Sequence, residues 1–300
     1  MDNLIRLENV IDYNERVGVE TLHPLVNVID LSKCQKVKQG RLFFGFYAVF
    51  LKDLKCGDLH YGKKYYDYQE GTLIFIGPGQ VVGVENKEEV YYQPKGWVLL
   101  FHPDLIRGTS LGREINQYTF FSYETKEALH LSKRERNIVL ESFSNIAYEI
   151  EQSIDKHSKK LIVNNIELFL NYCMRFYDRQ FITRENVNKG ILEEFESLLN
   201  EYFHSEKSQL EGIPYVGYFA EKLNLSPNYF GDLVKKETGK SAKEYIQLKL
   251  IQISKEKLFD TSKSVSEIAH ELGFKYPQHF NRMFKKSTGS SPGEFRQGMN

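Results

Sequence analysis

The sequence has few cysteines and no long hydrophobic run. Its three cysteines, Cys34, Cys56 and Cys173, are an odd number without a CxxC spacing, which argues against a disulfide framework and a zinc knuckle. The longest apolar stretch, Leu42–Leu51, is only ten residues and too short to span a bilayer. The first six residues lack the apolar segment of a signal peptide. We therefore expect a cytoplasmic protein with no membrane partner.

The chain also lacks an excess of charge of either sign. Its 40 basic and 40 acidic residues cancel, and residues 201–300 hold 15 basic and 12 acidic side chains. An asymmetry this mild does not by itself indicate nucleic-acid binding. Function has to be inferred from pattern instead.

Residues 1–130 are rich in aromatic and β-branched residues that turn formers interrupt. Short strands are predicted at Arg41–Leu51, at Thr72–Ile76 before Gly77-Pro78-Gly79, and at Trp97–Phe101 before Pro103. This spacing predicts a β-sandwich or a small barrel.

From about residue 130 the hydrophobic period becomes helical, and residues 131–204 form a predicted helical linker or dimerisation region. A capping box, Ser132 to Glu135, begins a helix whose apolar residues are Val139, Phe143, Ile146, Ile150 and Ile154. A second series predicts an antiparallel partner helix: Ile162, Ile166, Phe169 and Cys173. A third helix carries Ile191, Phe195, Leu198 and Tyr202, and residues near 205–213 are the expected hinge into a last domain at 205–300.

This last region contains the same unit twice. Ten positions match at an offset of 50 residues, namely Phe230, Leu233, Val234, Lys235, Lys236, Thr238, Gly239, Ser241, Glu244 and Tyr245 with Phe280, Met283, Phe284, Lys285, Lys286, Thr288, Gly289, Ser291, Glu294 and Phe295. Upstream the offset is 49, so one residue has entered the second turn.

Each unit is predicted to be a helix, a tight turn and a second helix. Small residues at the helix crossing, Ala220 and Ala269, are followed four positions later by Asn224 and Gly273, which tolerate the left-handed backbone that ends a helix sharply. Ser226-Pro227 supplies an N-cap and a first-turn proline. Between the units, a helix from about Ser241 to Phe259 acts as a spacer of nearly 30 Å, close to one ~34 Å turn of duplex.

With these residues in place, Pro214 to Arg296 resembles the tandem helix-turn-helix domain of the AraC/XylS family of transcription regulators. The second unit matches best, through Val265-Ser266-Glu267-Ile268-Ala269, Leu272-Gly273-Phe274, Phe284-Lys285-Lys286, Thr288-Gly289, Ser291-Pro292 and Phe295-Arg296. In the first unit, Asn224 stands where the family often has glycine.

The resemblance implies an α+β fold: an N-terminal cupin-like barrel or sandwich that senses an effector, then helices, then an all-α DNA-binding domain. It implies a bacterial, sequence-specific transcription regulator that is not an enzyme and needs no cofactor. The expected partners are double-stranded DNA, an unknown small-molecule effector, a second copy of the chain through residues 132–178, and RNA polymerase as a further candidate.

The polar face of each predicted recognition helix offers candidates for base readout. In the second unit these are Gln278, His279, Asn281 and Arg282, and in the first Asn228, Tyr229 and Asp232. We hypothesise that the second unit carries more base readout, because Gly231 has no side chain and phosphate repels Asp232. Lysines suit phosphate contacts, which position a protein without specifying sequence: Lys235, Lys236, Lys275, Lys285 and Lys286. A solvated helix face is the alternative for each residue.

Two motifs suggest other chemistry but lack its context. Gly108-Thr109-Ser110-Leu111-Gly112 matches the G-x-S-x-G nucleophile elbow of hydrolases, yet Pro103 and Asp104 separate it from the preceding strand. Gly239-Lys240-Ser241 resembles the end of a P-loop, but Val234 stands where the first glycine belongs. The histidines His23, His60, His102, His130 and His157 are scattered, so no metal site is predicted, and a Cys34–Cys56 thiol switch lacks supporting residues.

The strongest rival is a small-molecule sensor whose DNA contact is incidental. Aromatic residues of the first domain would line its pocket, since tyrosine offers both stacking area and a hydroxyl; core packing is the alternative. The candidates are Tyr61, Tyr65, Tyr66, Phe75 and Trp97, with Tyr68, Tyr91 and Tyr92.

Overall fold

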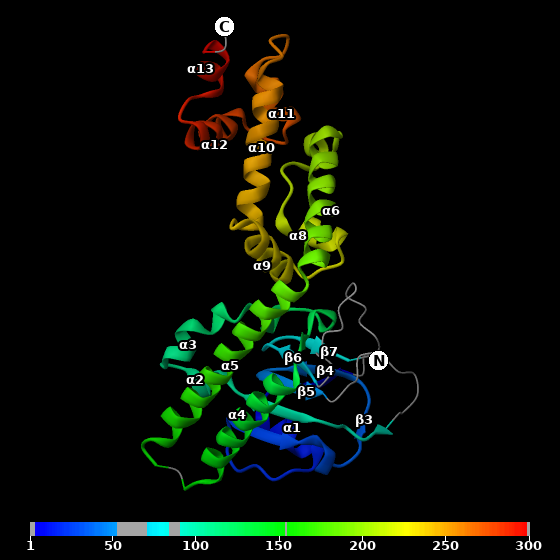
Figure 1. Ribbon diagram of the computed structural model, residues 1–300, viewed down its shortest axis with the longest axis vertical. Helices are drawn as coiled ribbons and strands as arrows, with labels where there is room; N and C mark the ends of the chain where they lie inside the picture. The colour runs from blue at the N-terminus through cyan, green and yellow to red at the C-terminus, as the bar shows by residue number, and fades with distance from the viewer. Residues whose placement is uncertain (1–3, 53–70, 84–90, 154, 299–300) are drawn as a thin grey trace. The chain divides into compact units, whose positions relative to one another are not determined.

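A computed structural model describes residues 4–52, 71–83, 91–153 and 155–298 in two compact units, Met1–Arg184 and Glu185–Asn300 (Figure 1). The first is mixed α and β and the second is entirely helical, which confirms the predicted fold class. The second unit begins at Glu185, before the hinge expected near residues 205–213. No helix in the described ranges is long and apolar enough to cross a membrane.

Within the described residues, the strands of the first unit form three sheets. The largest has the strand order β10-β6-β5-β9-β2, and its members are β2 (Val26–Asp30), β5 (Tyr47–Lys52), β6 (Thr72–Ile76), β9 (Trp97–Phe101) and β10 (Leu129–His130). The smaller sheets are β1 (Leu4–Leu7), β4 (Arg41–Phe44) and β7 (Val81–Val82), and β3 (Val37–Lys38) with β8 (Tyr91–Tyr92). The β-rich prediction is confirmed, and the likeness to a cupin barrel stays a prediction.

The central sheet has two different faces because side chains alternate along a strand. In β5, Val49 and Leu51 are fully buried on one face, whereas Phe50 and Lys52 are half-buried on the other. The register pairs Phe50 with Ile74 and Lys52 with Thr72 of β6. Helix α1 (Val10–Val17), which Asn9 caps, contributes Tyr13 to the core on the Phe50 side.

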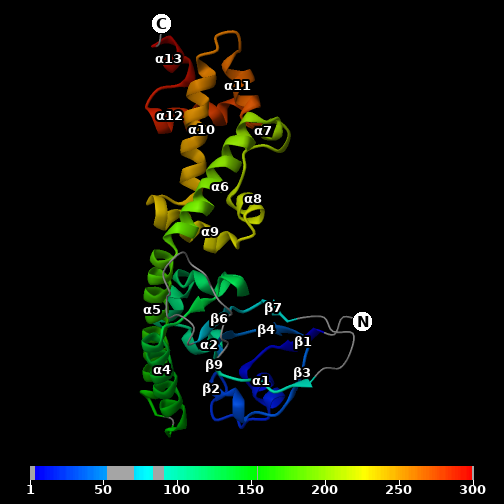
Figure 2. The same cartoon turned by 45° about the vertical axis from the view of Figure 1, so that its right-hand side comes forward.

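On the opposite face lie the helices that follow the strands. Helices α4 (Lys133–Glu151) and α5 (Ser158–Thr183) run side by side in opposite directions (Figures 1 and 2), as predicted. The Arg179 guanidinium of α5 binds both carboxylate oxygens of Glu135, at 3.0 and 2.7 Å, and also donates to the carbonyl of His130. The Ser132–Glu135 capping box is present, so one carboxylate both caps α4 and ties it to α5.

The G-x-S-x-G sequence lies between two short helices, α2 (Pro103–Ile106) and α3 (Ser110–Glu114), and does not follow a strand directly. Thr109 caps α3, and the Ser110 hydroxyl donates to the Glu167 carboxylate at 2.8 Å. The segment therefore has the geometry of a helix-to-helix turn, which differs from that of a nucleophile elbow.

The second unit consists of eight helices within its described residues: α6 (Glu185–His204), α7 (Lys207–Glu211), α8 (Val216–Lys222), α9 (Pro227–Thr238), α10 (Ala242–Leu258), α11 (Val265–Glu271), α12 (Pro277–Thr288) and α13 (Pro292–Gln297). They share one hydrophobic core that includes Phe195, Phe219, Phe230, Phe280 and Phe284. Because Phe195 of α6 packs on Phe219 and Phe230, with ring centroids about 5 Å apart, α6 belongs to this unit.

Candidate nucleic-acid interface

Two helix-turn-helix units occupy the ends of α10, with α8 and α9 at one end and α11 and α12 at the other (Figures 1 and 2). Their turns have the predicted left-handed residues: Asn224 has φ 54° and Gly273 has φ 91°. Asn224 is the only non-glycine residue with positive φ among the described residues. Ala220 and Ala269 are fully buried where each pair of helices crosses.

The predicted caps are also present. The Ser226 hydroxyl accepts from the amide of Tyr229 at 3.2 Å, and Pro227 occupies the first turn of α9. Gly239 and Gly289 end α9 and α12 in the left-handed conformation. Since Gly239 is a helix C-cap and Ser241 begins the capping box of α10, the P-loop-like sequence has a structural explanation.

Arg296 fixes the C-terminal end of α10 to the second helix-turn-helix unit. Its guanidinium donates to the carbonyls of Leu258, Lys263 and Asp260, at 3.1, 2.9 and 3.3 Å respectively. Carbonyls at a helix C-terminus have no partner within the helix, so a guanidinium both satisfies them and complements the helix dipole. Arg296 therefore positions the second unit on its spacer.

Helix α7 supports the second turn from outside the repeat. The Ser208 hydroxyl donates to the Glu271 carbonyl at 2.7 Å. A Cβ on Gly273 would lie 2.6 Å from the backbone carbonyl oxygen of Ser208 and 2.6 Å from the carbonyl carbon of Gly212. Gly273 thus allows a close backbone approach in addition to the left-handed turn. The turn was predictable from Gly273 itself, whereas the contact with α7 was not.

The outer face of α12 is open and carries no acidic residue. Seven of its polar side chains are exposed, namely Gln278, His279, Asn281, Arg282, Lys285, Lys286 and Ser287. The core side of the same helix holds Phe280 and Phe284. This is the amphipathic arrangement that a recognition helix requires, because the buried face fixes the helix and the open face is left for a ligand.

The corresponding face of α9 differs, and one prediction there is wrong. Tyr229 is only 4% exposed and cannot present its side chain to a base edge. Helix α6 packs against α9 and gives it a wider buried face, Tyr229-Phe230 with Leu233-Val234. Of the other candidates, Asn228 is exposed and Asp232 is half-buried, and a Cβ on Gly231 would meet no atom within 4 Å.

The lysines proposed for phosphate contact, Lys235, Lys236, Lys275, Lys285 and Lys286, are all exposed. Two other lysines near the second unit are already paired: Lys257 and Lys263 bind the Glu271 carboxylate at 2.8 and 2.5 Å. Hydrogen bonds from these two ammonium groups lower the pKa of Glu271. Lys257 and Lys263 are therefore held by Glu271 within the domain.

The structure describes four of the aromatic residues proposed for an effector pocket, Phe75, Tyr91, Tyr92 and Trp97, and of these Tyr92 lines a cavity in the first unit. Tyr61, Tyr65 and Tyr66 lie outside the described residues, as do Tyr68 and Cys56. Phe75 is buried among the rings of Phe120, Phe121 and Tyr177, on the helix-covered face of the sheet. Trp97 is half-buried beside Asp30 and Ser32. Packing explains the position of Phe75.

Comparison with known proteins assigns the helical unit. Residues 219–298 match the family described as a helix-turn-helix domain. The chain is 33% identical over 79 residues to the arabinose operon regulatory protein of Salmonella typhimurium, covering 26% of this chain and 28% of that protein. It is 23% identical over 235 residues to the uncharacterized HTH-type transcriptional regulator YfiF of Bacillus subtilis, covering 78% and 71% of the two chains.

Among solved structures, the C-terminal domain of AraT, a response regulator from Geobacillus stearothermophilus, is similar at 26% identity with a TM-score of 0.32. That match covers 36% of this chain and 84% of the other. The chain spans less than a quarter of the length of other curated relatives that it matches.

The compact unit Glu185–Asn300 thus contains a tandem helix-turn-helix domain. This domain is of the AraC type, as the resemblance of its sequence implied.

Proposed function

We propose that this chain is a sequence-specific DNA-binding transcription regulator, in which α9 and α12 enter successive major grooves of one duplex. One observation carries the proposal: two helix-turn-helix units are attached to the two ends of a single helix and share its hydrophobic core. A shared core fixes the spacing and orientation of the two recognition helices.

The length of the spacer supports binding to one face of the duplex. Helix α10 has 17 residues, which at ~1.5 Å per residue corresponds to about 26 Å. Successive major grooves on one face are ~34 Å apart, and the recognition helices, which flank the spacer, extend the reach.

The two units are proposed to contribute differently. The open face of α12 presents an amide, an imidazole and a guanidinium, at Gln278, His279 and Arg282, which suit the edges of adenine and guanine. The face of α9 presents Asn228 beside the half-buried Asp232. We therefore infer that the second helix-turn-helix unit reads most of the DNA sequence. The first helix-turn-helix unit contributes mainly phosphate contacts through Lys235 and Lys236.

Selection from a randomised duplex library with the full chain tests the function. We expect enrichment of a motif whose affinity falls steeply with salt, because lysines and arginine that neutralise phosphates release counterions. The same titration with a scrambled duplex is the control, and it should show weaker binding with a similar salt dependence. Selection that enriches no motif would contradict the proposal.

The N-terminal compact unit, Met1–Arg184, is proposed to sense a small molecule and to dimerise. Exposed apolar side chains on α5, Leu161 and Leu168, lie on its outer face, seven residues apart. Such a stripe suits packing against a second copy. Sedimentation equilibrium that shows only monomer at micromolar concentration, with and without DNA, would eliminate the dimer.

A further inference from the structure

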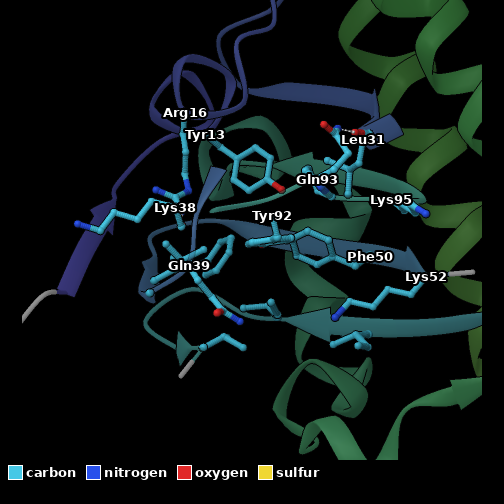
Figure 3. Close-up of a pocket in the computed structure, with 18 residues that line it drawn as sticks. Tyr13, Arg16, Leu31, Lys38, Gln39, Phe50, Lys52, Tyr92, Gln93 and Lys95 are labelled. Carbon is cyan, nitrogen blue, oxygen red and sulfur yellow. Dashed lines mark hydrogen bonds between the residues drawn. The ribbon is translucent and has the colours of Figure 1, made fainter. Parts of the chain in front are cut away.

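A cavity of about 490 Å³ lies in the first unit, on the face of the central sheet opposite α4 and α5 (Figure 3). The strands β5 and β6 form its floor through Phe50, Lys52, Ile74 and Ile76, and α1 contributes Tyr13. Cavities that bind small molecules commonly measure 300–1,000 Å³. The volume therefore suits a small organic ligand.

Lys52 is the unexpected residue of this floor. Strand alternation places it on the same face as Phe50, and both side chains lie along the cavity in Figure 3. It is half-buried, and among the described residues no carboxylate pairs with its ammonium group. Burial lowers the pKa of Lys52, because a desolvated ammonium group without a counterion is unfavourable.

Three further cationic residues line the cavity, Arg16, Lys38 and Lys95, and no aspartate or glutamate occurs among its described lining residues. The cavity thus concentrates positive charge, and a low-dielectric wall strengthens the field of such a cluster.

Aromatic rings supply the rest of the wall. Tyr13 contacts Phe44 and Phe50, with ring centroids 6.3 and 6.2 Å apart. The side-chain amide of Gln93 already donates to the carbonyls of Leu31 and Cys34. A ligand would therefore meet a cationic group at Lys52 and an apolar surface beside it.

We infer that this cavity binds a small organic anion with an apolar body, and that Lys52 is the counterion of its carboxylate or equivalent acidic group. The inference rests on the proposed sensing role of the first unit, and it adds the chemical class of the effector and the residue that selects it. Charge-assisted hydrogen bonds that a partly buried ammonium group donates to the ligand give the selectivity for an anion over its neutral analogue.

Calorimetric titration of the full chain with 1-naphthoate and with its neutral amide, 1-naphthamide, tests this inference. We expect naphthoate to bind at least about tenfold more tightly, a difference of about 1.4 kcal/mol. The substitution Lys52→Met should remove this preference and leave naphthamide binding unchanged, whereas Lys52→Arg should retain it. Lys36→Met, which removes an exposed lysine outside the cavity, is the matched control.

Lys52→Met should melt at or above the temperature of the unsubstituted protein, since it removes a desolvated charge, so unfolding will not mimic loss of binding. Equal affinity for the two probes, no naphthoate binding at millimolar concentration, or an anion preference that survives Lys52→Met would overturn the inference. The selection from a randomised duplex library contains neither naphthoate nor naphthamide and therefore tests DNA binding independently. If the protein still selects a motif but gives any of these three results, the anion site is rejected and the DNA-binding function is not.

Discussion

Replacing Gly273 by alanine is expected to unfold the second helix-turn-helix unit. The residue has φ 91°, which costs an alanine about 1–2 kcal/mol, and the added Cβ would lie 2.6 Å from backbone atoms of Ser208 and Gly212. Backbone atoms cannot move aside as a flexible side chain can, so we expect a total loss of about 4 kcal/mol or more.

Gly289→Ala is the matched control, because Gly289 has φ 86° and its Cβ would meet nothing within 4 Å. It should cost only the conformational term of about 1–2 kcal/mol. The single tryptophan, Trp97, lies in the first unit, so in urea its fluorescence transition should stay unchanged while helical circular dichroism is lost early in Gly273→Ala. Equal effects of the two substitutions would show that α7 does not press on this turn.

Replacing Arg282 by alanine is expected to weaken binding to the selected duplex by about 1–3 kcal/mol and to relax specificity at one or two base pairs. Arg282 is exposed on α12, on the face opposite Phe280 and Phe284, so its removal should leave stability unchanged. Lys285→Ala should instead weaken selected and scrambled duplexes alike and reduce the salt slope by about one.

Asn228→Ala on α9 provides the comparison between the two units, and it should have a smaller effect on specificity than Arg282→Ala. Undiminished specific binding by Arg282→Ala, or a larger loss of specificity from Asn228→Ala, would contradict the assignment of base readout to the second unit.

The backbone of the helix-turn-helix units could be predicted because it depends on local chemistry. Few residues adopt a left-handed conformation at a helix end, so Asn224 and Gly273 identified the turns, with φ of 54° and 91° in the structure. Ser241 and Ser291 similarly marked capping boxes that are present. Such signals lie within a few residues of the feature that they specify.

Features that depend on distant packing were not predictable in this way. The burial of Tyr229 accompanies the packing of α6 on α9, where Phe195 meets Phe230, 35 positions away in the sequence. A tyrosine suits a solvated helix face as well as a core, so its type gave no warning. Because of the same packing, the second compact unit begins at Glu185, whereas the last domain was expected to begin at residue 205.

Most of the cavity residues were missed for a related reason. Tyrosine content indicated residues 61–68 with Tyr91 and Tyr92, of which Tyr92 does line the cavity. Tyr13, Phe50 and Lys52 come together instead through the pairing of β5 with β6 and the position of α1. A signal was present in the strand itself: Lys52 continues the alternation of Phe50 and would therefore share its face.

The central claim, that one spacer helix holds two recognition helices against successive major grooves, is tested most directly by changing the helical phase of the operator. About five base pairs, half a turn, are inserted between the two contacted blocks of the selected duplex, and binding of the full chain is measured. Because α9 and α12 share one core with α10, we predict that affinity falls to about that of a duplex with one block. Affinity that is unchanged by the insertion would contradict the claim.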